Sequence, residues 1–223
     1  MIKPGYFGQI VPADNRRMAF DYWNEQLLLL KKHADVLFMG DSILELWDIP
    51  AYIGNELCIV NRAISGDNST YLLRRFDADC VQLAPKRCIL MIGTNDISEA
   101  DYDFLTRLPG QPADEVFERY KSNISGIIRK CDETGIELSI CSVIPSDIEP
   151  PYDKELRFSM TNRMNMFLID ETSRHKLSYI DFFPALCLPD NRTMKPEFTD
   201  DGIHPNAECY KIMAGILMRH LHE

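Results

Sequence analysis

The feature that most constrains the fold is a series of five short, continuous apolar runs. They cover residues 34–39, 57–60, 88–92, 136–144 and 177–182. A strand with one face in solvent alternates apolar and polar residues, whereas a strand covered on both faces is apolar throughout. The runs therefore predict five buried strands of a parallel sheet.

Amphipathic helices are expected between these strands, because apolar residues recur at helical spacing in the intervening segments. The segments lie around residues 20–30, 69–80, 116–131, 160–168 and 210–221. Strands that alternate with helices predict an α/β fold, a three-layer α/β/α sandwich with right-handed crossovers. The sequence shows no internal repeat and no long linker. We therefore expect a single domain over residues 1–223, with residues 1–33 as an N-terminal extension and helix packed on it.

The charge balance restricts the partners of the chain. Its 223 residues include 24 Lys and Arg against 34 Asp and Glu, a formal net charge of −10. An acidic surface repels phosphate backbones and anionic lipid headgroups, which argues against nucleic acid or a membrane as the main partner. No apolar run approaches the roughly 18 residues of a membrane span, and no secretory signal is visible. We expect a cytoplasmic protein that is not inserted in a membrane.

The seven cysteines do not suggest a disulfide framework. Their number is odd, they are widely spaced, and no Cys-x-x-Cys pair occurs. Most lie in apolar segments, where a free thiol behaves as a small hydrophobic side chain. We expect reduced core cysteines, and a nucleophilic or metal-bound cysteine is the alternative.

Four polar, glycine-bearing clusters follow the apolar runs. Residues 40–42 follow the first run, residues 61–67 the second and residues 93–96 the third, while residues 201–205 precede the last helix. Ligands of parallel sheets bind outside the carboxyl ends of the strands, so we expect the four clusters to meet at one rim. Each cluster alone is also explained by turn or helix-cap chemistry. Their order and position together favour a functional site.

The chemistry of these clusters fits a serine nucleophile. The hydroxyl of Ser42 attacks poorly unless a base takes its proton. His204 is the one histidine near the predicted rim, and a neutral imidazole accepts such a proton and returns it to a leaving group. Asp201, three residues before His204, can reach the other ring nitrogen from the same turn. The sequence thus predicts a Ser–His–Asp triad.

An acyl carbonyl under attack becomes an oxyanion and needs hydrogen-bond donors in place beforehand. The candidates are the backbone N–H groups of Ser42 and Gly66 and the side-chain amide of Asn95. The clusters contain one histidine among aspartates and no paired His or Cys spacing, so we expect no metal and no cofactor.

These clusters resemble the conserved blocks of the SGNH hydrolases, also called the GDSL esterase/lipase family. The similar stretches are residues 36–47 (VLFMGDSILELW), 61–66, 93–96 and 198–210 (FTDDGIHPNAECY). The resemblance implies a flavodoxin-like sheet of five parallel strands and metal-independent hydrolysis of esters or thioesters. It also implies catalytic roles for Ser42, Asp201 and His204, and oxyanion-hole roles for Ser42, Gly66 and Asn95. The chain departs from the pattern at Ala63 and Cys209, where many members have glycine.

Further residues near the rim are candidates for contact with substrate: Asp41, Asp67, Asn68, Tyr102, Phe104 and Tyr152. Each has a structural alternative. Asp41 can make structural hydrogen bonds, and Asp67 and Asn68 can cap the next helix. The three aromatic residues form an apolar wall or pack on helices.

The expected function is that of a serine esterase or acylhydrolase that hydrolyses a short acyl or acetyl ester through an acyl-enzyme. The absence of a long apolar lid helix from the sequence pattern argues against a lipase for bulky lipids. An O-acetylated carbohydrate and a lysophospholipid-like ester both fit, and no residue selects between them. An acyltransferase using the same serine and a catalytically silent binding module remain alternatives. The resemblance leaves both a monomer and a homodimer open.

Overall fold

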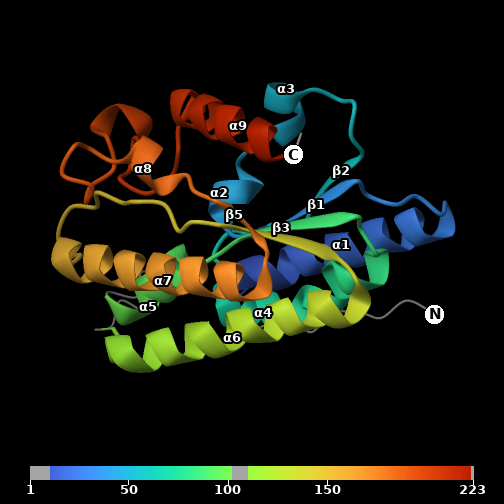
Figure 1. Cartoon of the computed structure of the whole chain (residues 1–223), viewed down its shortest axis with the longest axis horizontal. Coiled ribbons are helices and arrows are strands. Elements are labelled where there is room, and N and C mark those ends of the chain that lie inside the picture. The colour runs from blue at the N-terminus through green and yellow to red at the C-terminus, as the bar shows by residue number, and fades with distance from the viewer. Residues whose placement is uncertain (1–10, 102–109, 222–223) are drawn as a thin grey trace. The chain divides into compact units, whose positions relative to one another are not determined.

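The computed structural model describes residues 11–101 and 110–221 (Figure 1). Its strands are β1 (Val36–Gly40), β2 (Ile59–Asn61), β3 (Arg87–Met91), β4 (Glu137–Cys141) and β5 (Ser178–Ile180). They form a five-stranded parallel sheet in the order β2-β1-β3-β4-β5, flanked by helices. The predicted α/β class and the five parallel strands are confirmed.

The continuous apolar character of the runs reflects burial on both faces of the sheet. All five residues of β1 are buried, as are the last four of β3 and of β4. In the register of the sheet, Val36 lies opposite Ile59 of β2 and Arg87 of β3. The parallel pairing of β1 with both neighbours places their carboxyl ends at one edge.

Five long helices match the predicted amphipathic segments: α1 (Val11–Leu29), α4 (Ser69–Asp79), α6 (Ala113–Thr134), α7 (Lys154–His175) and α9 (Ala207–Leu221). Gly135, directly after α6, has the left-handed φ of 71° that commonly stops a helix. The described residues also contain four shorter helices: α2 (Ser42–Glu45), α3 (Ile49–Ile53), α5 (Thr94–Ala100) and α8 (Phe183–Leu186). Segments of four to seven residues are too short to show a helical period.

The chain forms two compact units. The first comprises the described residues up to Ile92 together with residues 122–139, and the second comprises the described parts of residues 93–121 and 140–223. In the first unit, α1 contacts α4, and the ring of Phe20 packs on Ile64. In the second unit, both α7 and α9 contact β5. The single domain expected from the sequence stays a prediction.

The cysteines serve mainly as core residues, as expected. All seven are free thiols, and all except Cys58 are buried. Burial raises the pKa of the Cys187 thiol to about 12, and it has the same effect on Cys209. These thiols are therefore protonated at neutral pH and poor nucleophiles. In the described part of the chain, no helix is both long and apolar enough to cross a membrane.

Candidate active site

Ser42 lies at the point where β1 turns into α2. Asp41 is the N-cap of α2, and its Oδ1 accepts a hydrogen bond from the backbone N–H of Ile43 at 3.0 Å. The side chain of Asp41 thus caps this helix, and Ser42 is its first residue. A Cβ on Gly40 would lie 2.4 Å from the backbone oxygen of Met91, so the strand can end this way only with glycine.

The segment after β2, residues 62–68, is called the Gly66 loop below. Because β1 and β2 are parallel neighbours, this loop and Ser42 both follow the carboxyl ends of their strands and lie at the same edge of the sheet. The Ile64 N–H donates to the Gly40 oxygen at 3.0 Å, and the Ser65 N–H donates to the Glu45 carboxylate. The loop is thus tied to the residues before and after Ser42.

Gly66 has the conformation and the hydrogen-bonding state expected of an oxyanion donor. Its φ is 85°, a value that favours glycine. Among the described residues, no acceptor binds its backbone N–H. An ideal Cβ at this position meets nothing within 4 Å, so conformation, and not space, requires the glycine.

His204 and Asp201 form one tight turn of the second unit. The His204 Nδ1 lies 2.6 Å from Asp201 Oδ2. The other carboxylate oxygen accepts the backbone N–H groups of Ile203 at 2.9 Å and His204 at 2.8 Å. The turn passes through Gly202, whose φ is 83° and whose Cβ would lie 2.3 Å from the Asp147 oxygen. The ring is therefore oriented by its own turn.

The Asp201 carboxylate is charged at neutral pH. Partial burial by itself would raise its pKa, but the His204 ring and the two backbone N–H groups lower the pKa to about 2. An ionised carboxylate only accepts hydrogen bonds, so the Nδ1 of a neutral His204 carries the proton. Its Nε2 then carries the lone pair that a general base requires.

Asn95 is the second residue of α5 and belongs to the second unit. The helix is capped by Gly93, whose φ is 144° and whose Cβ would lie 2.6 Å from Val143 Cγ2. Asn95 is half-buried, and the following Asp96 is buried. Glycine at position 93 thus lets α5 begin directly beside the segment that follows β4.

The predicted catalytic residues fall into the two units. Ser42 and Gly66 belong to the first unit, and Asn95, Asp201 and His204 belong to the second. The contact between Asp201 and the His204 ring is the one that the spacing predicts. The meeting of both groups in one crevice, and the role of each residue, stay predictions.

The described candidates for substrate contact have partners within the chain. Asp67 pairs with Arg75 at 2.6 Å, and Asn68 caps α4 by accepting the Tyr71 N–H at 2.9 Å. The Tyr152 ring lies 5.8 Å from the Arg157 guanidinium carbon. Substrate contact by Asp41, Asp67, Asn68 and Tyr152 stays a prediction, and Tyr102 and Phe104 lie outside the described residues.

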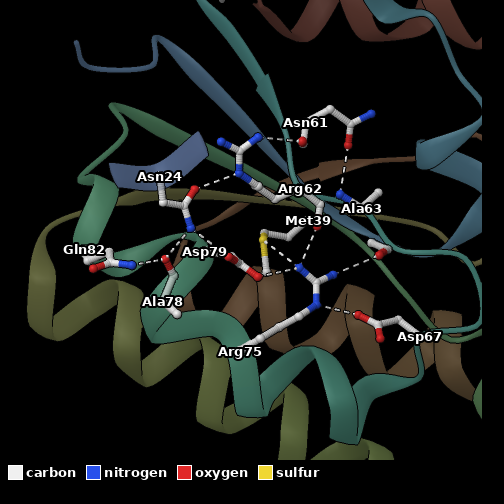
Figure 2. Close-up of polar contacts among 11 residues, drawn as sticks. Asn24, Met39, Asn61, Arg62, Ala63, Asp67, Arg75, Ala78, Asp79 and Gln82 are labelled. Atoms are coloured by element: carbon white, nitrogen blue, oxygen red, sulfur yellow. Dashed lines mark hydrogen bonds and ion pairs between the residues drawn. The ribbon is translucent and has the colours of Figure 1, made fainter. Parts of the chain in front are cut away.

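A buried charged cluster lies beside the Gly66 loop and was not predicted from the sequence (Figure 2). It comprises Arg75, Asp67, Asp79, Arg62 and Asn24, and all five side chains are buried. A signal was present, because Arg75 and Asp79 share the face of α4 that carries Leu72 and Phe76. A charged residue on the apolar face of a helix is buried together with that face, and buried charges are almost always paired.

Residues 38–212 match the GDSL-like lipase/acylhydrolase family. The chain belongs to this family. The family resemblance seen in the sequence is thus confirmed, and the chain is classed with acylhydrolases. Within the described residues, no group of three or more His, Cys, Asp or Glu side chains is arranged to hold a metal ion.

Solved structures agree with this assignment. A GDSL-like lipase from Bacteroides thetaiotaomicron is 25% identical, with a TM-score of 0.75 over 94% of this chain and 98% of that one. A lipase/acylhydrolase from Enterococcus faecalis is 18% identical, with a TM-score of 0.62 over 83% and 94%. An acetylxylan esterase from Geobacillus stearothermophilus is 17% identical, with a TM-score of 0.65 over 85% and 94%. The last two share the fold. No curated protein matched the sequence.

Proposed function

We propose that this GDSL-family protein is a serine esterase that hydrolyses a short acyl or acetyl ester through an acyl-enzyme on Ser42. The observation that carries the proposal is the Asp201–His204 pair, with its 2.6 Å contact and a carboxylate pKa lowered to about 2. This pair supplies a base whose proton-bearing nitrogen is fixed and whose other nitrogen can accept a proton.

In the first half-reaction, the Ser42 Oγ attacks the acyl carbon while His204 Nε2 takes the hydroxyl proton. The carbonyl electron pair moves onto oxygen, and the backbone N–H of Ser42, the N–H of Gly66 and the Asn95 amide donate to the oxyanion. The carbonyl then re-forms, the bond to the alkoxide breaks, and the imidazolium protonates the leaving alcohol. Ser42 retains the acyl group as an ester.

Water completes the cycle. His204 takes a proton from a water molecule as its oxygen attacks the acyl carbon, and the same donors bind the second oxyanion. Collapse of this intermediate breaks the bond to Ser42 Oγ, which recovers its proton from the imidazolium. The products are the carboxylic acid and the free enzyme. Asp201 keeps its charge throughout and stabilises the imidazolium.

Acetyl esters of carbohydrates are the first substrates to test. An acetylxylan esterase of known structure shares the fold over 85% of this chain. A small acyl group also suits a chain whose sequence pattern predicts no long apolar lid helix. The proposal therefore ranks acetyl esters above long-chain lipid esters.

A fluorophosphonate probe and p-nitrophenyl acetate together test the proposal. We expect one probe molecule on Ser42 by peptide mass spectrometry, and a loss of hydrolysis by about 10⁴–10⁶-fold in Ser42→Ala. Ser173→Ala is the matched control, because Ser173 is exposed on α7. Circular dichroism of each variant checks the fold. Unchanged turnover in Ser42→Ala would remove Ser42 from the mechanism, and a wild-type protein without labelling would favour a silent binding module.

The partition of the acyl-enzyme separates a hydrolase from an acyltransferase. We expect acetate as the main product even when a sugar acceptor is added in excess over the ester. Mass spectrometry of the products measures the ratio of acetate to acetylated sugar. Predominant transfer to the sugar would replace the hydrolase proposal with the transferase.

A further inference from the structure

One buried guanidinium joins several parts of the first unit (Figure 2). Arg75 Nε donates to Asp67 Oδ2 at 2.6 Å, and one terminal nitrogen donates to the Arg62 backbone oxygen at 2.6 Å and to Asp79 Oδ2 at 3.1 Å. The other terminal nitrogen lies 3.3 Å from the Gly40 backbone oxygen. The side chain of Arg75 is 3% exposed, and those of Asp67 and Asp79 are fully buried.

Three acceptors of this guanidinium lie close in sequence to the proposed catalytic residues Ser42 and Gly66. Gly40 lies two residues before Ser42, while Arg62 begins the Gly66 loop and Asp67 directly follows Gly66. Arg75 therefore connects the chain that carries the nucleophile to both sides of the glycine whose N–H has no acceptor in the described part of the chain.

We propose that Arg75 is a positioning residue, which acts through Asp67 to hold the Gly66 N–H at the place where the oxyanion forms. This inference rests on the proposed function, because it takes Ser42 as the nucleophile and Gly66 as an oxyanion donor. Neither Arg75 nor Asp67 needs to touch the substrate for this role.

The physical reason is the geometry of the guanidinium. Its planar fork donates in fixed directions, so each acceptor is held in place relative to the others. Burial by itself would lower the pKa of Arg75, but Asp67 and Asp79 raise it above its ordinary value. The group thus remains charged, and its hydrogen bonds to carboxylates are of the strong, charge-assisted kind.

The Gly66 loop is held at several points, and the pair of Asp67 with Arg75 is one of them. The backbone bond from Ile64 to Gly40 holds the beginning of the loop, and the Ser65 N–H binds Glu45. Beyond Gly66, the Asp67 N–H donates to the Ile64 oxygen at 3.1 Å, and the Asp67 side chain ties this turn to Arg75. An oxyanion donor acts over about 2.7–3.1 Å, and a misplacement of about 1 Å can cost about 10²-fold in rate.

Asp79 provides a matched control within the same cluster. It binds the same guanidinium, but it ends α4, an 11-residue helix that spans about 16 Å. Its Oδ1 accepts a hydrogen bond from Asn24 of α1 at 2.9 Å. Asp79 therefore joins Arg75 to α1, whereas Asp67 joins Arg75 to the Gly66 loop.

The test compares Asp67→Asn with Asp79→Asn. Each substitution removes one carboxylate charge that faces the Arg75 guanidinium and keeps the size of the side chain. For p-nitrophenyl acetate, we expect Asp67→Asn to lower kcat by about 10–10²-fold with KM within about 2-fold, because the loss concerns the transition state. Labelling of Ser42 by the fluorophosphonate should slow in parallel. Asp79→Asn should leave kcat within about 3-fold, and thermal unfolding measures the stability cost of both.

Arg75→Lys keeps the charge and removes the fork, and it tests the inference independently if Asp67→Asn fails to fold. We expect the same kcat loss as for Asp67→Asn, and no further loss in the double variant, because both act on one contact.

Equal kcat values for Asp67→Asn and Asp79→Asn at equal stability would overturn the inference. A raised KM with normal kcat in Asp67→Asn would also overturn it and assign Asp67 to substrate contact. If wild-type Ser42 is not labelled, the proposed function itself fails, whereas a labelled Ser42 with insensitive variants defeats this inference alone.

Discussion

The carboxylate of Asp201 binds His204 twice, once at the ring nitrogen Nδ1 and once at the backbone N–H. The two contacts use different oxygens: Oδ2 contacts the ring and Oδ1 accepts the backbone N–H. The same short segment therefore fixes both the rotation of the ring and the position of its backbone. A base held in this way loses little entropy when it takes a proton.

Replacement of Asp201 by Asn should keep the shape of the turn and remove the charge. The amide can present its NH₂ group to Nδ1, which would place the ring proton on Nε2 and block the base. We expect kcat for p-nitrophenyl acetate to fall by about 10³–10⁴-fold. Asp200→Asn is the control, because this neighbouring carboxylate is exposed and the structure gives it no bond to the ring. Equal activity of the two variants would exclude the proposed role of Asp201.

Asp201 should also contribute to stability in a pH-dependent way. Its pKa falls from 3.8 to about 2 on folding, so the folded state favours the charged form. Such a contribution is fully present above pH 3.8 and is lost as the pH falls toward 2. Urea unfolding of the wild type and of Asp201→Asn should show a stability difference that is constant from pH 7 to pH 5 and shrinks below pH 4. A difference that does not change between pH 6 and pH 3 would contradict the lowered pKa.

The fold was largely readable from the sequence because parallel strands buried on both faces leave an unmistakable apolar pattern. The run at residues 34–39 became β1 (Val36–Gly40), and the run at 88–92 became β3 (Arg87–Met91), each shifted by one or two residues. Such shifts arise because strand ends depend on hydrogen bonds to neighbours that the sequence does not show.

The site was readable only in part. Asp201 and His204 are three residues apart, so their contact is a local property of one turn. Arg75 and Asp67 are eight residues apart on a helix and the preceding loop, and their pairing depends on burial that the helical pattern alone does not reveal. A charged residue beside Phe76 on an apolar face was the available clue.

Gly202 should tolerate no side chain. Its left-handed φ costs an alanine about 1–2 kcal/mol, and the close approach to the Asp147 oxygen adds a clash with backbone that cannot rotate away. We expect Gly202→Ala to lose about 2–4 kcal/mol of stability and most of the esterase activity. Gly215→Ala is the control, because Gly215 lies in α9 and a Cβ there meets nothing within 4 Å. That variant should be neutral or more stable by up to about 1 kcal/mol, and urea unfolding measures both.

Gly66 and Gly135 form a matched pair, because both have a left-handed φ but only Gly66 lies in the loop proposed to bind the oxyanion. Their φ values are 85° and 71°, and a Cβ at either position meets nothing within 4 Å. An alanine at each position should therefore cost about 1–2 kcal/mol of stability from strain alone. Gly135 ends α6, whereas Gly66 follows β2 in the loop tied to Ser42.

Only Gly66→Ala should lose activity beyond its stability cost. To relieve the strain, the loop must rotate the backbone that carries the Gly66 N–H, and the loss of one oxyanion donor costs about 10²–10³-fold in kcat. Gly135→Ala should keep kcat within about 2-fold at a temperature where both variants are folded. Stopped assays with p-nitrophenyl acetate, run beside urea unfolding, separate the two effects. If both alanine variants retain the same kcat at the same stability, the Gly66 N–H does not bind the oxyanion.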